Sequence, residues 1–410
     1  DKNTLEWKAL EAACAATRMS VPRLLEKCGG IASSRDYHLN RFLREHFHSG
    51  VEFGEFGPIT APEDLPLAEA MAFSIDDAAT TEIDDAFSVT KLGNKNLRIG
   101  IHIAAPALGV AAGSPLDALA ARRLSTVYMP GEKIHMLPEA MIHLFTLGEE
   151  RVCPVLSMYL EVTSDDYQEV GTETRLERVC IAANLRHDSL EAHFNEITVA
   201  QGHVDYPFGD ELRILWRFAN RLAAARGKAD AAEGDKIDYN FRVENERVSI
   251  TERRRGSPID KVVSELMIQV NTEWGRQLSA ARVAAIYRSQ GNGKVKMTTT
   301  PSPHQGLGVE QYTWASSPLR RYIDLINQRQ LIATIRGEAP PYAQGSEALL
   351  TAMRDFELAY EAYAGFQRAM ERYWCLRWLI QEGISGIAGE VIRENLVKIE
   401  RLPLTVRVPS

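Results

Sequence analysis

The stretch "FSIDDAATTEIDDAF" (residues 73–87) concentrates five carboxylates within ten residues: Asp76, Asp77, Glu82, Asp84 and Asp85. Charged residues make up an ordinary 25% of the whole chain, so this density is a local feature. Two unit charges about 4 Å apart repel by roughly 1 kcal/mol in bulk water and roughly 4 kcal/mol near a protein surface. Such a cluster therefore either points into solvent or holds a cation.

Strand patterns flank the cluster on both sides. The segments "MAFSI" (71–75), "AFSVTKL" (86–92) and "LRIGIHIAA" (97–105) are rich in β-branched and aromatic residues, and "GNKN" (93–96) predicts a hairpin between the last two. Asp76 ends one predicted strand, while Asp84 and Asp85 open the next. Because a strand–loop–strand turn brings its two ends together, we expect Asp76 and Asp84 or Asp85 to converge on one point.

The ligand type points to a hard cation. Carboxylates without Cys or His select Mg²⁺ or Mn²⁺ over zinc, and Mg²⁺ with few protein ligands completes its shell with water and substrate phosphates. This predicts phosphodiester or phosphoryl-transfer chemistry. The segment lacks the register of an EF-hand calcium loop, and a glycosidase would need only two carboxylates. A solvated acidic loop stays open as the alternative.

The overall composition is that of a globular protein. The 410 residues suffice for two or three domains, and the longest apolar run, 89–112, is interrupted by charged residues. We therefore expect no membrane partner and no signal peptide. The five cysteines are widely spaced without a C-x-x-C pair, which argues against disulfides and predicts a cytoplasmic location. A net charge of −8 argues against a surface coated in phosphate contacts, but it leaves room for a basic channel.

A second informative stretch is "YTWASSPLRRYIDLINQR" (312–329). Ser317 followed by Pro318 predicts a helix over 318–336 that carries Arg320 and Arg321 in its first turn. Cations at a helix N-terminus oppose the macrodipole, so we expect the two arginines to face an anion that the helix end also favours. The alternative is that both arginines pair with acidic neighbours.

The remaining pattern predicts three parts. Residues 3–48 read as three helices, and "VEFGEFG" (51–57) as a wing, so residues 1–60 form either a helix-turn-helix-like module or a plain three-helix packing module. Further helices are expected over 113–124, 258–280 and 347–381, with strands at "VLSMYLEVTSD" and "TRLERVCIAANL". The tail, 384–410, predicts two or three strands.

Two motifs together resemble a known family. "SIDDAATTEIDD" (74–85) and "SSPLRRYIDLINQR" (316–329) resemble the ribonuclease II / ribonuclease R family of RNB-domain exoribonucleases. Ordered matches lie between them at "VYMPGEKIHMLP" (127–138), "VVSELMIQVN" (262–271) and "PHQGLG" (303–308). The resemblance covers about residues 70–380. It implies an α+β fold: a mixed α/β RNB catalytic domain over 61–383, the helix-turn-helix-like module before it, and the start of a C-terminal OB-fold RNA-binding domain over 384–410.

The resemblance also implies an activity and its residues. It implies a processive, hydrolytic 3′→5′ exoribonuclease that releases nucleoside 5′-monophosphates from single-stranded RNA with Mg²⁺, or Mn²⁺, as its only cofactor. The expected metal positions are Asp76, Glu82, Asp84 and Asp85, with Glu82 standing where the family usually has Asp. Asp84 and Arg320 are the expected catalytic residues. RNA contacts are expected from Tyr128, which would stack on terminal nucleotides, and from Arg320 and Arg321. We expect a monomer.

Two rival functions follow from the same residues. The chain departs from the family pattern at Ala105, where Asp is common, and at Gln367, where Glu is often found. One rival is an RNA-binding or regulatory protein on the same fold with weak or no nuclease activity. The other is a metal-dependent deoxyribonuclease. Glu265 and Asn271 match family positions, but we expect them to support helix packing.

Overall fold

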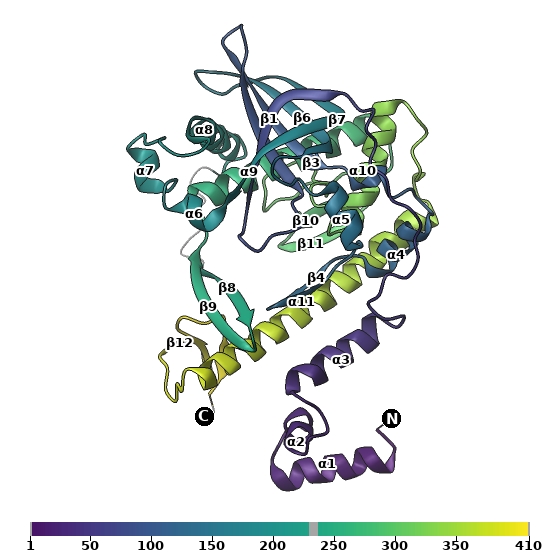
Figure 1. Ribbon diagram of the computed structural model, residues 1–410, viewed down its shortest axis with the longest axis vertical. Coiled ribbons are helices and arrows are strands. Elements are labelled where there is room, and N and C mark those ends of the chain that lie inside the picture. The colour runs from purple at the N-terminus through teal and green to yellow at the C-terminus, as the bar shows by residue number, and fades with distance from the viewer. Residues whose placement is uncertain (1, 229–236, 409–410) are drawn as a thin grey trace.

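A closed five-stranded barrel forms the centre of the molecule (Figure 1). The structure, a computed structural model, describes residues 2–228 and 237–408. The barrel strands run in the order β1-β2-β3-β6-β7, and their bounds are Leu67–Asp76, Asp85–Lys91, Asn96–Ala104, Val152–Thr163 and Glu169–Arg186. Neighbouring strands are antiparallel except β1 and β7, which pair in parallel and close the barrel. The predicted strands around the acidic cluster and the hairpin at 93–96 are confirmed.

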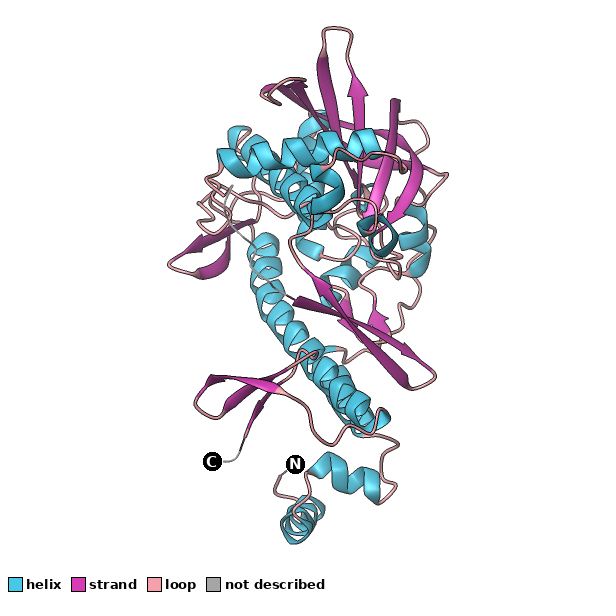
Figure 2. Ribbon diagram, turned by 90° about the vertical axis from the view of Figure 1, so that its left-hand side faces the viewer, coloured by secondary structure: helices cyan, strands magenta, loops and turns pink. Residues whose placement is uncertain are grey.

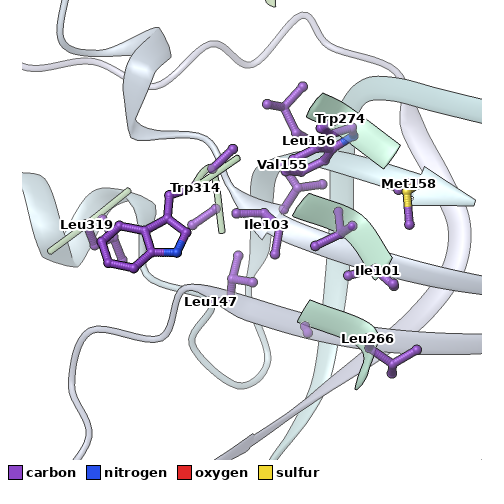
Figure 3. Packing of buried hydrophobic residues seen from close by; sticks show 14 of the residues in the cluster. Ile101, Ile103, Leu147, Val155, Leu156, Met158, Leu266, Trp274, Trp314 and Leu319 are labelled. Carbon is purple, nitrogen blue, oxygen red and sulfur yellow. The ribbon is translucent and has the colours of Figure 1, made fainter. Parts of the chain in front are cut away.

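Helices cover the barrel and share its core. The covering helices include α8 (Gly209–Ala225), α9 (Pro258–Ala280) and α10 (Tyr322–Arg336). Figure 3 shows Ile101 and Ile103 of β3 near Leu266 and Trp274 of α9, all fully buried. Trp314 and Leu319, which precede α10, belong to the same hydrophobic cluster. This packing anchors the segment before α10 to the barrel.

Shorter elements complete the region around the barrel. The helices are η1 (Pro106–Leu108), α4 (Pro115–Arg123), α5 (Glu139–Phe145), α6 (His187–Glu191) and α7 (Glu196–Ala200). Three two-stranded hairpins join β4 (Val127–Met129) to β5 (Glu132–Ile134), β8 (Ile237–Glu244) to β9 (Arg247–Arg254), and β10 (Tyr287–Gly291) to β11 (Lys294–Thr298). The helix expected over 113–124 is confirmed as α4, and the Ser114 side chain accepts a hydrogen bond from the Asp117 N–H, as a cap should.

A buried polar trio lies between strands β2, β3 and β6. The two ring nitrogens of His102 each lie 2.8 Å from a serine hydroxyl, Nε2 from Ser88 and Nδ1 from Ser157. Gly100 leaves room for this trio, because a Cβ there would lie 2.4 Å from Ser88 Oγ. His102 is fully buried, and burial lowers its pKa to about 3.

Replacing His102 with Gln is expected to reduce the pH dependence of stability. The unfolded chain takes up a proton at this histidine below about pH 6.5, whereas the folded chain does not until the pH approaches 3. The stability that the neutral imidazole contributes is therefore complete above pH 6.5 and is lost as the pH falls. In urea unfolding, the wild type should lose about 2 kcal/mol more than the variant between pH 7 and pH 5. Equal losses in the two proteins would contradict this assignment.

The N-terminal helices α1 (Leu5–Thr17), α2 (Val21–Lys27) and α3 (Ser34–His46) stand away from the barrel (Figure 1). They reach the rest of the molecule through α3, where the Phe42 ring stacks on Phe366 of α11 (Glu347–Gln381) with ring centroids 3.9 Å apart. The predicted wing is wrong, because residues 51–57, all described, contain no strand. Arg123 instead binds this extended segment through the Val51 carbonyl and lies 3.7 Å above the Phe53 ring.

The C-terminal end forms the predicted strands. β12 (Gly389–Arg393), β13 (Leu396–Ile399) and β14 (Thr405–Arg407) make an antiparallel sheet that packs on Cys375 of α11 through Leu402 and Leu404. Figure 2 shows the barrel strands at one end of the molecule and both termini at the other. The domain boundaries and the OB-fold character of this sheet stay predictions. Among the described helices, none combines the length and apolar character needed to cross a bilayer.

Candidate active site

A pocket of about 920 Å³ opens where β1 ends and β2 begins. The β4–β5 hairpin, the β8–β9 hairpin, α9 and the turn before α10 supply its other walls. Among the lining residues are Asp76, Asp77, Glu82, Asp84, Asp85, Tyr128 and Arg320. The pocket thus brings together every predicted site residue except Arg321.

Asp84 is held at the base of the pocket by the turn before α10. The Leu319 N–H donates to its Oδ1 at 2.9 Å, and Arg320 Nε donates to its Oδ2 at 3.1 Å. Burial raises the pKa of Asp84 to about 7, against the opposing effect of the Arg320 charge. The pair places a buried carboxylate and a guanidinium in one fixed arrangement.

Among the described residues, no arginine, lysine or histidine forms an ion pair with Asp76 or Asp85. Burial raises the pKa of Asp76 to about 6, and its Oδ2 is buried without a hydrogen-bond partner among residues 2–228 and 237–408. Burial, followed by the charges of Asp76 and Asp84, raises the pKa of Asp85 well above its usual value. An unpartnered buried oxygen beside crowded carboxylates is costly unless a cation approaches it.

The fit to a divalent cation is therefore partial. Over residues 2–228 and 237–408, no three or more His, Cys, Asp or Glu side chains are grouped closely enough to hold a metal ion by themselves. Asp76 and Asp85 offer oxygen ligands of the type that Mg²⁺ prefers. The arrangement fits an ion that takes the rest of its shell from water and phosphate oxygens, not a closed protein cage.

Glu82 is occupied elsewhere and does not support its predicted metal role. Its Oε1 accepts from Thr126 Oγ1 at 3.1 Å and lies 3.0 Å from His135 Nδ1, while Oε2 accepts from Tyr128 OH at 3.3 Å and from Lys133 Nζ at 3.4 Å. Burial opposes ionisation, but the His135 hydrogen bond and the Lys133 charge hold the pKa of Glu82 below its usual value. Glu82 is thus ionised, and its hydrogen bonds connect the acidic loop to the β4–β5 hairpin.

Tyr128 presents its ring to the pocket from β4. The residue is 36% exposed although its hydroxyl is tied to Glu82. Burial of the hydroxyl, followed by the charge of Glu82, raises the pKa of Tyr128. A neutral, oriented and accessible ring is a suitable platform for stacking a base.

The turn that carries Arg320 differs from the prediction. Helix α10 begins at Tyr322, with Arg321 as its N-cap, so both arginines precede the helix instead of lying in its first turn as predicted. Buried Asp324 accepts from the Ser317 N–H at 2.8 Å and draws residues 317–321 into a turn. Arg320 also donates to Ser317 Oγ at 2.9 Å and remains 41% exposed toward the pocket.

Arg321 points away from the pocket. It pairs with Asp324 at 2.8 Å and lies 4.0 Å over the Trp314 ring, with 13% of its side chain exposed. The alternative reading, in which both arginines pair with acidic side chains, is met by both: Arg321 pairs with Asp324 and Arg320 with Asp84. The predicted RNA contact by Arg321 is therefore not supported by this geometry.

Further pocket residues were missed by sequence reasoning. Arg253 of β9 pairs with Asp260 of α9 at 2.5 Å and with Asp77 at 3.2 Å, and His187 lies within 3.3 Å of Asp260. Arg253 stands in the "RRR" run at 253–255, whose charge was the available signal.

Asn271 has the packing role that was expected. Its side chain accepts from the Ala315 N–H and donates to Ser316 Oγ, both at 2.8 Å.

With the barrel and its acidic pocket described, the class of the protein follows. Residues 65–296 and 292–337 match the profile of the RNB domain family. These matches span more than half of the chain, so the chain belongs to the RNB domain family, and the predicted resemblance and mixed α+β fold are confirmed.

Among its relatives, the chain is 27% identical to Exoribonuclease 2 of Aeromonas hydrophila, over 92% of this chain and 64% of the relative. It thus spans less than two thirds of that relative. Two solved structures share the fold: the Dss1 exoribonuclease of Candida glabrata, with TM-score 0.71, 21% identity and coverage of 84% and 53%, and yeast Ssd1, a pseudonuclease, with TM-score 0.71, 16% identity and coverage of 89% and 54%.

Proposed function

We propose that this protein is a hydrolytic 3′→5′ exoribonuclease that releases nucleoside 5′-monophosphates processively from single-stranded RNA. One observation carries the proposal: a single pocket combines the unpartnered buried oxygen of Asp76, the guanidinium of Arg320 and the accessible ring of Tyr128. Relatives named exoribonuclease support an RNA-degrading activity. A monomeric, cytoplasmic enzyme remains a prediction from the sequence.

Asp76 and Asp85, with Asp84 beside them, would hold Mg²⁺ or Mn²⁺. Such an ion supplies Lewis-acid charge for phosphodiester hydrolysis when bound. The unpartnered oxygen of Asp76 and the raised pKa of Asp85 support this assignment. Glu82 is left out of the proposed ligand set because its two oxygens already serve the β4–β5 hairpin.

Arg320 would stabilise the charge that develops on the scissile phosphate. Asp84 and Ser317 hold its Nε and one Nη, so the guanidinium needs no reorganisation when the phosphate arrives. Tyr128 would stack on a terminal base, which requires no particular sequence. The two residues together would position the last linkage against the carboxylates.

An oligoribonucleotide labelled at its 5′ end tests the proposal. With Mg²⁺ the protein should produce a descending ladder of shortened RNA, and a chelator should abolish it. Intact RNA under both conditions would exclude the nuclease. The matching oligodeoxyribonucleotide tests the deoxyribonuclease alternative, which requires that DNA be cut at least as fast as RNA.

An RNA-binding or regulatory protein is the second candidate. The absence of a preassembled group of three metal ligands within the described ranges favours it, and so does the fold shared with a protein described as a pseudonuclease. This candidate predicts that RNA binds with equal affinity with and without Mg²⁺ and that no product forms. Because phosphate contacts dominate such binding, the affinity should fall steeply with salt.

The variant Glu82→Gln tests whether Glu82 binds a metal ion or only connects the acidic loop to the β4–β5 hairpin. The variant keeps the size of the side chain but removes the negative charge that contacts His135 and Lys133. We expect a loss of about 1–3 kcal/mol in the free energy of unfolding, with Mn²⁺ affinity, measured by electron paramagnetic resonance, changed by less than about twofold. A drop in Mn²⁺ affinity of about 10–100-fold, as expected for a metal-site residue, would restore the original prediction.

Replacing Tyr128 with Ala tests the stacking platform. Stacking contributes roughly 1–3 kcal/mol per base, so RNA affinity should fall about 5–150-fold, and the limit product should become longer. Tyr128→Phe is the matched control, because it keeps the ring and removes only the hydroxyl that contacts Glu82. An unchanged limit product in the alanine variant would count against the platform.

A further inference from the structure

A second cavity of about 310 Å³ adjoins the candidate active site. Ser264 on α9 lines both spaces, so one helix forms the boundary between them. The walls come from the end of α8, from α9, which packs beside α8 (Figure 1), and from the loop at 303–308. Its size lies at the lower end of the roughly 300–1,000 Å³ typical of small-molecule sites.

Cationic side chains outnumber acidic ones among the described residues that line this cavity. Arg226, Lys228 and Lys261 line it, against a single carboxylate, Glu265. Arg226 pairs with Glu265 and also donates to the Leu307 carbonyl, so these two charges neutralise each other. Among the described residues that line the cavity, the two lysines remain as the excess positive charge.

Neither lysine is paired with a carboxylate in the described part of the chain. Lys261 Nζ donates to a neutral partner, Asn220 Oδ1, at 2.7 Å, and Lys228 Nζ has no hydrogen bond within residues 2–228 and 237–408. Gly308 brings the loop close to Arg226 and Lys228, because a Cβ there would lie 2.7 Å from the Arg226 carbonyl oxygen and 3.4 Å from Lys228 Cε. The lysines thus line a narrow space beside the apolar side chains of Ile268 and Leu307.

The negative charge of the proposed reaction product indicates what a cationic cavity beside the acidic pocket would bind. A released nucleoside monophosphate carries between one and two negative charges near neutral pH. In the acidic pocket, the ionised fraction of Asp76, Asp84 and Asp85 disfavours that added charge once the bond to the RNA has been broken, although Arg320 lies beside them. A cationic cavity across Ser264 offers lysines to the phosphate and apolar surface to the base or ribose.

From these observations we infer that the second cavity binds the nucleoside monophosphate product as it leaves the acidic pocket. The inference rests on the proposed exoribonuclease function for the source of the nucleotide. Lys228 and Lys261 bind the phosphate of that product.

Direct binding of AMP tests the inference without requiring catalysis. Equilibrium dialysis of the full chain in EDTA, which excludes binding through a divalent ion, should detect AMP but not adenosine, which lacks the phosphate. The double variant Lys228→Met/Lys261→Met should bind AMP about 100-fold more weakly, at about tenfold per charge-assisted contact. The matched control is Lys91→Met/Lys398→Met, which removes two exposed lysines outside the cavity and should bind as the wild type does.

A conservative variant distinguishes loss of AMP binding from loss of folding. Lys228→Arg/Lys261→Arg keeps both charges and should retain AMP binding within about threefold, while melting curves compare the folding of all variants. AMP affinity unchanged by the methionine pair, or adenosine binding as tightly as AMP, would overturn the inference. If RNA is not cleaved but AMP binding depends on both lysines, the proposed function fails while the nucleotide cavity stands.

Discussion

Asp84→Asn should reduce RNA turnover at least about 1,000-fold while leaving RNA binding intact. Asparagine keeps the shape and can still accept from the Leu319 N–H, but it removes the charge that holds Arg320 Nε and that contributes to the acidic cluster. Losing one preorganised electrostatic group in an active site costs about 10²–10³ in rate, and here two functions are lost together. RNA affinity should stay the same or rise, because a carboxylate that repels phosphate has been removed.

Single-turnover rates and RNA dissociation constants, measured on the same preparations, check this result. Asp77→Asn is the matched control: Asp77 is the next acid along the same pocket wall, its side chain is 54% exposed, and its partner is Arg253, so its turnover should stay within about tenfold of the wild type. Turnover in Asp84→Asn within tenfold of the wild type would remove Asp84 from the mechanism. Loss of RNA binding would assign it to substrate recognition instead.

Arg329→Met should produce the largest loss of stability. Arg329 lies on α10 and donates to Asp117 Oδ1 of α4 at 2.7 Å, where both side chains are less than 10% exposed. It also donates to the Val110 carbonyl at 3.0 Å and to Tyr342 OH at 2.6 Å. Breaking a buried pair from one side leaves an uncompensated charge, so we expect a loss of about 3–5 kcal/mol in the free energy of unfolding.

A double variant distinguishes the orphaned charge from lost packing. In Arg329→Met/Asp117→Asn no charge is left unpaired, and the asparagine can still accept from Tyr322 OH, which donates to Asp117 at 2.9 Å. The double variant should therefore recover at least about 1 kcal/mol relative to Arg329→Met in urea unfolding. If it is less stable than the single variant, the deficit comes from lost packing and hydrogen bonds, not from the buried charge.

The local pattern predicted much of the fold because strand and helix signals are short-range. The β-branched segments around residues 71–105 became β1, β2 and β3, and the long helix over 347–381 has the expected bounds. Closure of the barrel through the parallel pairing of β1 and β7 had no local signal, since the two strands lie far apart in the sequence. The predicted wing failed for a related reason: Arg123 binds the backbone of that segment, and no partner strand does.

The candidate site divides in the same way. The density of acids in residues 76–85 alone identified the place, because like charges crowded so closely need either a cation or solvent. Side chains distant in the sequence decide which of these acids are free to bind a cation. Lys133 and His135 engage Glu82, and the turn at 317–321 engages Asp84, whereas one oxygen of Asp76 is buried without a partner in the described part of the chain.

Two adjacent arginines mark the limit of what the sequence by itself determined. Sequence alone established the acidic cluster, the strands that carry it and the presence of cations near position 320. Only the tertiary structure separated Arg320, which faces the pocket beside Asp84, from Arg321, which faces Asp324 and Trp314. The physical reason is that a side chain's direction depends on the charges and rings packed around it, and those come from distant parts of the chain.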